Sequence, residues 1–377
     1  MTTFIAFLLL FPLLFYAAYT AVMTWSFEQI SPTEDKSDGQ YPFVSIIIPS
    51  RNEERNIEKC IRSVCQQKYP TDKYEVICLD DHSTDATLKF LTQLQEEFEQ
   101  LIVIKMADHP GLSQKKQALS LGIQQSKGEI IVQTDADCWV GKEWLETIVS
   151  RFGEETGMVS GPVLLHGSAN VLERFQTLEY MGLSVLGAGA IQMRKPTMCN
   201  GANLAYRKQT FLEVNGFQDI AHIASGDDEL LMQKINLQTD WEIRFAKDSR
   251  AIVNSQALNS WADIRAQRLR WVSKARAYLD RSINLVQILF LLSFMNLIIL
   301  VGLSIWSKYW ISTLITGVLL KVIPDFCILF TAAKFFHKLP LLKYLPILQP
   351  AYLLYVIWIG VAGNIVSTYN WKGRQVS

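Results

Sequence analysis

The sequence has no excess of charge of either sign, since 36 lysine and arginine residues balance 36 aspartate and glutamate residues. It also lacks a basic stretch interleaved with aromatic residues, so neither net charge nor pattern predicts a nucleic-acid partner. The six cysteines form no CxxC pair and have no histidine at zinc spacing, which argues against a zinc site. We expect free, mostly buried thiols, as in a reducing compartment.

Charged residues are also missing from a long apolar block at the start of the chain. Residues from Phe4 to Phe27 contain no charged side chain and are long enough to cross a bilayer. A cleaved signal peptide needs a basic start, which Met1-Thr2-Thr3 lacks. We therefore expect a membrane anchor over residues 1–27, followed by a linker over 28–40.

Further apolar blocks lie near the C-terminus, at about 283–306, 311–336 and 345–369. They predict about three membrane segments within 282–370, followed by a short tail over 371–377. Lys321 and Pro324-Asp325 interrupt the middle block, which is compatible with a kinked span, a re-entrant loop or a break between two short pieces.

Positive charge gathers between the last two apolar blocks, at Lys334, His337, Lys338 and Lys343. By the positive-inside rule this loop is cytoplasmic. Counting spans then puts the central domain in the cytoplasm and the tail outside. The expected protein is an integral component of the cell (inner) membrane, in contact with the lipid bilayer.

The central residues, 41–260, alternate strand and helix patterns, which predicts an α/β domain with a mixed, mostly parallel sheet flanked by helices. Phe43 to Ile48 is an almost unbroken apolar run, as in a strand covered on both faces, and Pro49 is expected to end it. Further strands are expected at 75–79, 101–104 and 129–134.

Polar clusters follow three of these expected strands. They are Ser50-Arg-Asn-Glu53, Asp80 to Asp85, and Asp135-Ala-Asp137. In open α/β sheets, ligands bind outside the carboxyl ends of the strands, so we expect these clusters to share a site. Two carboxylates at i and i+2 offer hard oxygen ligands to Mg²⁺ or Mn²⁺, and such an ion typically holds a nucleotide diphosphate.

Residues 261–281 mix positive charge with aromatic side chains, including Gln267-Arg-Leu-Arg-Trp271. This composition is typical of an interfacial helix that lies on a bilayer, with arginines reaching lipid phosphates. A catalytic role is compatible with it, since Arg270 would neutralise a diphosphate and Trp271 would stack on a sugar. Asp227 and Asp228 precede an expected helix, where a carboxylate either caps the helix or acts as a base.

In their order and spacing these residues resemble the family-2 inverting glycosyltransferases of the GT-A fold. Ile48 to Glu53 is similar to the family's P-x-x-N-E signature, and Leu79 to Thr87 to its D-D-x-S-x-D-x-T element. Gln114 to Leu119 is similar to G-K-x-x-A-L, and Gln267 to Trp271 to Q-x-x-R-W. Two motifs depart from the family: G-G-A-N reads Asn200-Gly-Ala-Asn203 here, and T-E-D reads Gly226-Asp-Asp228.

The resemblance implies a role for each matching residue. It implies a catalytic base at Asp228, with Asp227 as the other candidate, and metal binding by Asp137 and Asp135. The implied nucleotide and donor contacts are Pro49, Arg51, Glu53, Asp80, Asp81, Lys115, Asp135, Asn203, Gln267, Arg268, Arg270 and Trp271.

The function that this resemblance implies is sugar transfer at a membrane. The donor is a nucleotide-sugar, expected to be a UDP-sugar, used with Mg²⁺ or Mn²⁺, and the acceptor is a lipid or lipid-linked molecule, as in ceramide-glucosyltransferase-like enzymes. Processive polysaccharide synthases share Q-x-x-R-W and remain an alternative, although so few membrane helices favour single transfer. A non-catalytic nucleotide-binding membrane scaffold is a further alternative. The sequence makes no prediction of oligomeric state.

Overall fold

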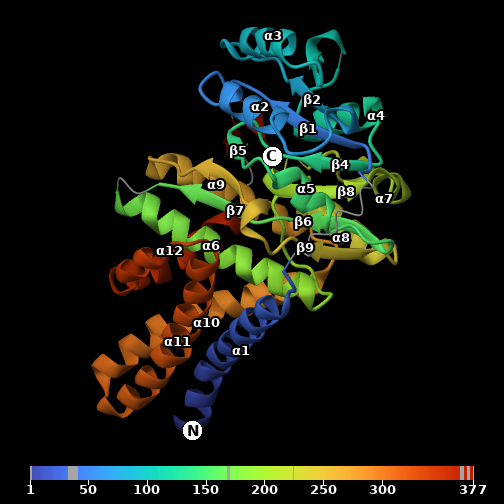
Figure 1. Cartoon of the computed structure of the whole chain (residues 1–377). Coiled ribbons are helices and arrows are strands. Elements are labelled where there is room, and N and C mark those ends of the chain that lie inside the picture. Colours follow the sequence, from blue (N-terminus) through green and yellow to red (C-terminus); the bar gives the residue numbers. More distant parts are fainter. Residues whose placement is uncertain are drawn as a thin grey trace.

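A computed structural model describes residues 2–32, 41–109, 111–167, 170–223, 225–365, 369–371 and 374–376. Most of the expected linker, 33–40, and tail residues 372, 373 and 377 lie outside these ranges. Figure 1 shows an α/β part at the top and a bundle of long helices at the bottom. The bundle consists of α1 (Thr2–Gln29), α10 (Arg281–Trp306) and α11 (Ile311–Phe335).

The α/β part is built on a seven-stranded sheet in the order β3-β2-β1-β4-β8-β6-β9. The β1–β2, β1–β4, β2–β3 and β6–β9 pairs are parallel, whereas β8 runs antiparallel to β4 and β6. This confirms the predicted mixed, mostly parallel sheet. The strands are β1 (Val44–Ser50), β2 (Tyr74–Asp80), β3 (Leu101–Lys105), β4 (Ile130–Gln133), β6 (Thr156–Ser160), β8 (Leu204–Arg207) and β9 (Glu242–Phe245).

Helices cover both faces of this sheet. Ile46 and Ile48 of β1 share one buried cluster with α2, α3 and α5, while Ile47 shares a second cluster with α4, α7 and α8. This alternation of side chains explains why β1 reads as an unbroken apolar run. The helices are α2 (Ile57–Cys65), α3 (Thr87–Glu97), α4 (Lys115–Gln125), α5 (Trp144–Val149), α7 (Lys208–Glu213) and α8 (Glu229–Gln238).

Strand β1 runs through Pro49 to Ser50, so the expectation that Pro49 ends it was wrong. The last pairing between β1 and β4 joins Ile47 to Gln133, so the missing N–H of Pro49 costs no ladder bond on that side. Pairing with β2 continues to Ser50 and Asp80, which makes Asp80 the last strand residue.

A smaller sheet and two helices join the α/β part to the bundle. The sheet has the order β5-β10-β7, with β5 (Cys138–Val140), β10 (Val253–Gln256) and β7 (Val163–His166). Helix α6 (Val171–Gln192) follows β7 and packs against α1 and α11. Helix α9 (Trp261–Ser273), which carries the Q-x-x-R-W residues, follows β10 and leads through a short 3₁₀ turn, Lys274–Ala277, into α10.

Four helical stretches are long and apolar enough to cross a membrane: Thr2–Gln29, Arg281–Trp306, Lys308–Phe335 and Leu339–Gly363. This agrees with the predicted apolar blocks. Of the three readings of the middle block, the structure shows one unbroken helix, α11, with Pro324 inside it.

Two charged residues in the middle of α11 face other helices. Lys321 and Asp325 lie one turn apart, form an ion pair and are both buried. Tyr16 of α1 donates a hydrogen bond to Asp325, and Gln349 bonds to both charged side chains. A charged pair satisfied in this way avoids the cost of facing lipid.

Helix α12 (Leu345–Ile365) lies beside α9 at the junction between the bundle and the α/β part (Figure 1). Leu348 near its start belongs to the same buried cluster as Phe27, and Gly363 near its end lies against Val272 of α9. Strand β11 (Tyr369–Trp371) then also contacts α9. The tail therefore returns toward the α/β part, whereas counting spans placed it on the opposite side, because hydropathy gives the length of a helix and not its direction.

Candidate active site

One cavity of about 720 Å³ joins the carboxyl ends of the central strands to the membrane helices. Its polar end is walled by the segments that follow β1, β2 and β4 and by the start of α8. Most residues singled out in the sequence lie on this wall: Pro49, Arg51, Glu53, Asp81, Lys115, Asp135, Asp137, Asp227, Asp228, Gln267, Arg268, Arg270 and Trp271.

Lys115, the first residue of α4, joins two of the acidic motifs. Its Nζ lies 2.7 Å from Oδ1 of Asp135 and 3.1 Å from Oδ2 of Asp227. Gln133 donates a second hydrogen bond to Oδ2 of Asp227, at 2.8 Å. Burial opposes the charge of Lys115, but Asp135 and Asp227 outweigh it and raise its pKa above the ordinary value. Lys115 therefore stays a cation at the end of β4.

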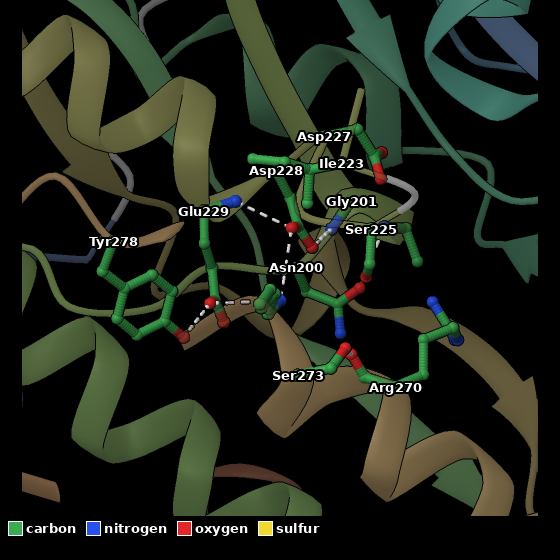
Figure 2. A network of polar contacts seen from close by, with 12 residues as sticks. Asn200, Gly201, Ile223, Ser225, Asp227, Asp228, Glu229, Arg270, Ser273 and Tyr278 are labelled. Atoms are coloured by element: carbon green, nitrogen blue, oxygen red, sulfur yellow. Dashed lines mark hydrogen bonds and ion pairs between the residues drawn. The ribbon is translucent and has the colours of Figure 1, made fainter. Parts of the chain in front are cut away.

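Asp228 is the N-cap of α8, and its carboxylate is held by three donors. Oδ1 accepts from the Glu229 N–H at 2.7 Å and Oδ2 from the Gly201 N–H at 3.0 Å (Figure 2). The Nζ of Lys274 lies 3.6 Å from Oδ1. Burial alone would raise the pKa of Asp228, but the charges of Lys274 and Lys115 outweigh burial and lower it to about 2. Asp228 is thus an ionised carboxylate on the cavity wall.

Glu229, the neighbour of Asp228, has a different environment. Its Oε2 accepts from the Tyr278 hydroxyl at 2.6 Å and lies 3.1 Å from the Nζ of Lys274 (Figure 2). Burial raises the pKa of Glu229, although Lys274 opposes the shift. Lys274 thus bridges two adjacent carboxylates whose pKa values are shifted in opposite directions.

The carboxylates at the end of β4 fit a divalent ion that arrives with a diphosphate. Asp135 and Asp137 place hard oxygen atoms on the cavity wall beside Lys115. Among the described residues, no group of three or more His, Cys, Asp or Glu side chains forms a metal cage. Mg²⁺ and similar ions commonly take only one or two carboxylates and complete their shell with substrate phosphates. The donor set therefore suits a nucleotide-bound ion.

The end of the cavity near β1 and β2 is tied together by Arg51. Its Nη1 donates to the carbonyl oxygens of Asp81 and His82, at 2.6 and 3.1 Å. The carboxylate of Asp81 accepts from the Gln114 N–H at 3.1 Å, just before α4 begins. Glu53 accepts from the Asn56 side chain at 2.9 Å. These contacts fix the loops on which a nucleotide would lie.

Asn203 was predicted to contact the donor, but the structure places it behind the cavity wall. It is fully buried, and its amide nitrogen donates to the carbonyls of Pro162 and Ala251 at 2.7 and 2.8 Å. Its oxygen accepts from the Trp144 indole at 3.1 Å. Because every polar group of its side chain is hydrogen-bonded within the protein, Asn203 stabilises the wall of the cavity from behind.

Asp80 was also predicted to contact the donor and is also buried, but its Oδ1 has no hydrogen-bond partner among the described residues. It is buried at the end of β2, off the cavity wall, and its Oδ2 accepts from the Ser83 N–H at 3.3 Å. Its neighbour Asp81 reaches the cavity. Of the two carboxylates, Asp81 is therefore the one that lines the cavity.

The Q-x-x-R-W residues of α9 divide into a buried pair and cavity-facing groups. Arg268 is 3% exposed, pairs with Glu179 at 2.5 Å and lies over the Trp271 ring at 4.1 Å. Its charge is already neutralised, so it is poorly suited to bind a phosphate. Among the described residues, no carboxylate pairs with Arg270, which also lines the cavity. The Trp271 and Tyr180 rings lie 5.8 Å apart.

Several groups on the wall were not predicted from the sequence. The Gly201 N–H and the Lys274 ammonium hold Asp228, and Tyr278 holds Glu229. Lys274 lies three residues beyond Trp271, so continuing the helix pattern of that motif would have placed it near the same site. The Gly201 contact is made by the backbone and has no signal in side-chain type.

Away from the carboxylates, the cavity wall becomes apolar and aromatic. This end lies between α1, α6, α10 and α12, three of which are long and apolar enough to span a membrane. Its lining includes Tyr16, Tyr19, Leu183, Leu186, Phe290, Leu291, Phe294, Tyr352, Tyr355 and Ile359.

Curated proteins similar to this chain include a glycosyltransferase and a glucosyldiacylglycerol synthase. Glycosyltransferase AglE of Haloferax volcanii is 32% identical over 190 residues, which cover 50% of this chain and 59% of that protein. Beta-monoglucosyldiacylglycerol synthase of Trichormus variabilis is 34% identical over 144 residues, which cover 38% of this chain and 30% of that protein. The chain thus spans less than two thirds of the length of either relative.

A solved structure supports the fold. The mannosyltransferase PcManGT from Pyrobaculum calidifontis, in complex with GDP-Man and Mn²⁺, superposes with a TM-score of 0.58 at 18% identity, over 95% of this chain and 99% of that one. At this identity the likeness concerns the fold alone.

Two family models match the sequence. Glycosyl transferase family 2 matches residues 45–214, and Glycosyl transferase family group 2 matches residues 130–361. The first covers the strands that carry the acidic clusters, and the second extends through α9 into the membrane helices. Because the second match covers well over half of the chain, this protein belongs to the family-2 glycosyltransferases.

Proposed function

We propose that this protein transfers a sugar from a nucleotide-sugar, a UDP-sugar, to a lipid or lipid-linked acceptor in the membrane, with inversion at the anomeric carbon. The observation that carries the proposal is the single cavity. It has ionised and cationic groups at one end and an aromatic, apolar wall between membrane helices at the other. Such a cavity suits a substrate pair of which one is a charged nucleotide and the other carries an alkyl chain.

Asp228 is the base in this proposal. The acceptor hydroxyl attacks the anomeric carbon from the face opposite the diphosphate, and its proton passes to the Asp228 carboxylate. The carbon–oxygen bond to the diphosphate breaks, and the leaving group keeps the electron pair. The lowered pKa keeps Asp228 ionised at neutral pH, as a group that takes a proton must be.

Lys115 and Arg270 supply positive charge to the departing diphosphate. Lys115 is held beside Asp135, and Arg270 lines the same cavity without a carboxylate partner among the described residues. Fixed cations placed where charge develops stabilise a transition state without reorganising. A Mg²⁺ or Mn²⁺ ion bound by Asp137 and Asp135 would neutralise the same diphosphate.

The membrane position follows from the same geometry. The apolar end of the cavity opens among α1, α10 and α12, so the acceptor reaches Asp228 from the bilayer. The positive charge of Lys334, Lys338 and Lys343, between α11 and α12, favours the cytoplasmic side for the α/β part. The donor would then come from the cytoplasm.

The test is transfer of label from a panel of radiolabelled nucleotide-sugars into lipid extract, using membranes that contain the wild-type chain or Asp228→Asn. Reactions run with Mn²⁺ or with EDTA. We expect label in the organic phase from one donor, lost with EDTA and with Asp228→Asn.

Two other outcomes would contradict the proposal, and a third would change the assignment of the base. Label in high-molecular-weight aqueous material would favour the processive polysaccharide synthase. The non-catalytic scaffold would be favoured if the wild-type chain binds UDP with Mn²⁺ but transfers no sugar from any donor to any lipid class. Retention of transfer by Asp228→Asn would move the base to Asp227.

A further inference from the structure

Lys116 is a buried lysine that the proposed chemistry does not use. It follows Lys115 in α4, is 4% exposed and has no carboxylate partner among the described residues. Its ammonium instead donates to three backbone carbonyls. The acceptors are Ile220 and Ile223, each at 2.7 Å, and Ser225 at 2.9 Å.

Burying an ammonium that has no carboxylate partner costs free energy. Burying a charge costs several kcal/mol unless hydrogen bonds compensate, whereas an apolar side chain of similar length would pack at no such cost. Here all three N–H groups of the ammonium are used, and all three acceptors belong to one segment. The arrangement therefore ties α4 to the backbone of residues 220–225.

This segment leads directly to the acidic residues of the cavity. Ser225 and Gly226 precede Asp227 and Asp228, and Gly226 has a positive φ of 80°, so the chain turns sharply there. Figure 2 shows Ile223 and Ser225 beside Asp227 and Asp228. A shift in the backbone of 220–225 would carry the Asp228 carboxylate with it.

Two consecutive lysines of α4 thus hold the same segment in different ways. Lys115 holds the side chain of Asp227, and Lys116 holds the backbone before it. The N–H of Gln114, one residue before α4, is bonded to Asp81 at the nucleotide end. The start of α4 therefore connects the nucleotide end of the cavity to the candidate base.

We propose that Lys116 is a positioning residue, which fixes residues 220–225 so that the Asp228 carboxylate faces the reacting hydroxyl. This inference rests on the proposed function of Asp228. Lys116 touches no reacting atom, so its loss changes the position of the base and leaves the nucleotide contacts in place.

The charge state of Lys116 sets the conditions of the test. Burial lowers its pKa to about 8, the charges of Asp227 and Asp228 oppose that shift, and Lys274 adds to it. The three-donor ammonium predominates below this value. Measurements at neutral pH therefore examine the arrangement seen in the structure.

The test compares Lys116→Met with Lys234→Met in the full chain. Lys234 is the control, because its ammonium is also buried and holds the residues just before this segment, at the Gly216 carbonyl (2.8 Å) and Asp219 (3.2 Å). We expect both variants to lower the Tm. Only Lys116→Met should lower kcat, by about 100-fold, because a displacement of about 1 Å costs that much. Its KM for the donor should change less than about threefold, since the nucleotide contacts remain.

Hydrogen exchange gives a readout that does not depend on activity. We expect faster exchange in residues 218–228 of Lys116→Met and not in β1 or β4. Wild-type kcat in Lys116→Met, or an equal loss of kcat in Lys234→Met, would overturn the inference. If the wild-type chain transfers no sugar at all, the proposed function fails, and unchanged exchange in 218–228 would separately refute the positioning by Lys116.

Discussion

At the scale of single residues, the adjacent carboxylates Asp227 and Asp228 are held for different purposes. Asp227 is bound to Lys115 and Gln133, on the donor side of the cavity. Asp228 is bound to backbone N–H groups and to Lys274, beside the cavity-facing end of α9. In the proposed function, these partners suit Asp227 to organising the donor site, while Asp228 takes the proton.

This difference predicts that matched substitutions of the two residues change different kinetic constants. Asp228→Asn should lower kcat by about 10²- to 10⁴-fold with little change in donor KM, as expected for loss of a general base. Asp227→Asn releases Lys115, so it should mainly raise donor KM. Steady-state kinetics of both variants, with circular dichroism to confirm folding, measure this. If instead Asp227→Asn lowers kcat and Asp228→Asn raises the donor KM, Asp227 is the base and Asp228 organises the donor site.

The ion pair between Lys274 and Asp228 predicts that stability and activity depend on pH. The pKa of Asp228 is about 2 in the folded protein and about 3.9 when unfolded, so the ionised form stabilises the fold above about pH 4. That contribution is lost as pH falls from about 4 toward 2. In Lys274→Met the opposing charge is gone, burial dominates, and the pKa of Asp228 rises.

The measurement is kcat/KM against pH for wild type, Lys274→Met and the exposed control Lys308→Met. We expect loss of activity on the acidic side to begin at a higher pH in Lys274→Met alone. An acidic limb that coincides in all three proteins would show that Lys274 does not set the charge of Asp228.

The site residues that the sequence predicted are those carried by short motifs at strand ends. Asp135 and Asp137 follow β4, and the residue types alone indicate a diphosphate site. The Gly201 N–H was missed because its contact with Asp228 is made by the backbone, and Lys274 was missed because the helix pattern was not continued beyond Trp271. Asn203 was predicted to contact the donor because its motif fixes its position in the sequence, but a motif does not indicate which way a side chain points.

At the scale of helices, α11 carries a charged pair that contacts two of its neighbours. Lys321 and Asp325 contact Tyr16 of α1 and Gln349 of α12. A pair buried among helices stabilises them only as a complete set, because removing one partner leaves the other charge uncompensated.

Single and double substitutions of this pair should therefore not be additive. Lys321→Met or Asp325→Leu alone should destabilise the protein by about 3–5 kcal/mol. The double variant should recover part of this loss, though not all, since Tyr16 and Gln349 lose their acceptor. Thermal unfolding in detergent, arranged as a double-mutant cycle, measures the coupling. Strict additivity would mean that the two charges act independently.

Periodicity and apolar length predicted the helices and strands themselves, but not how the last helix is arranged. The blocks at 283–306 and 311–336 correspond to α10 and α11. The block at 345–369 became α12, whose Gly363 packs on Val272 of α9. That contact depends on the close approach of a glycine to one particular side chain, which hydropathy does not record.

At the scale of the whole molecule, the cavity is the feature that neither part has alone. The α/β part supplies the carboxylates and Lys115, and α1, α10 and α12 supply the apolar wall. Helix α6 runs between these parts, and Leu183 lines both the large cavity and a smaller one that reaches Asp325. Leu183 therefore marks the membrane end of the path that an acceptor would take.

Blocking this end should separate acceptor use from donor use. Leu183→Trp adds bulk to the wall, so transfer to lipid should fall by at least about tenfold, equivalent to about 1.4 kcal/mol. Binding of UDP with Mn²⁺ should be unchanged, because Leu183 belongs to the apolar part of the cavity wall and the Asp135 motif to the polar part. Leu183→Ala, which enlarges the same place, should keep transfer and extend it to acceptors with bulkier chains. If Leu183→Trp transfers normally, the acceptor enters elsewhere. If both variants lose UDP binding, a change at the apolar end of the cavity also disturbs the donor site, contrary to the geometry.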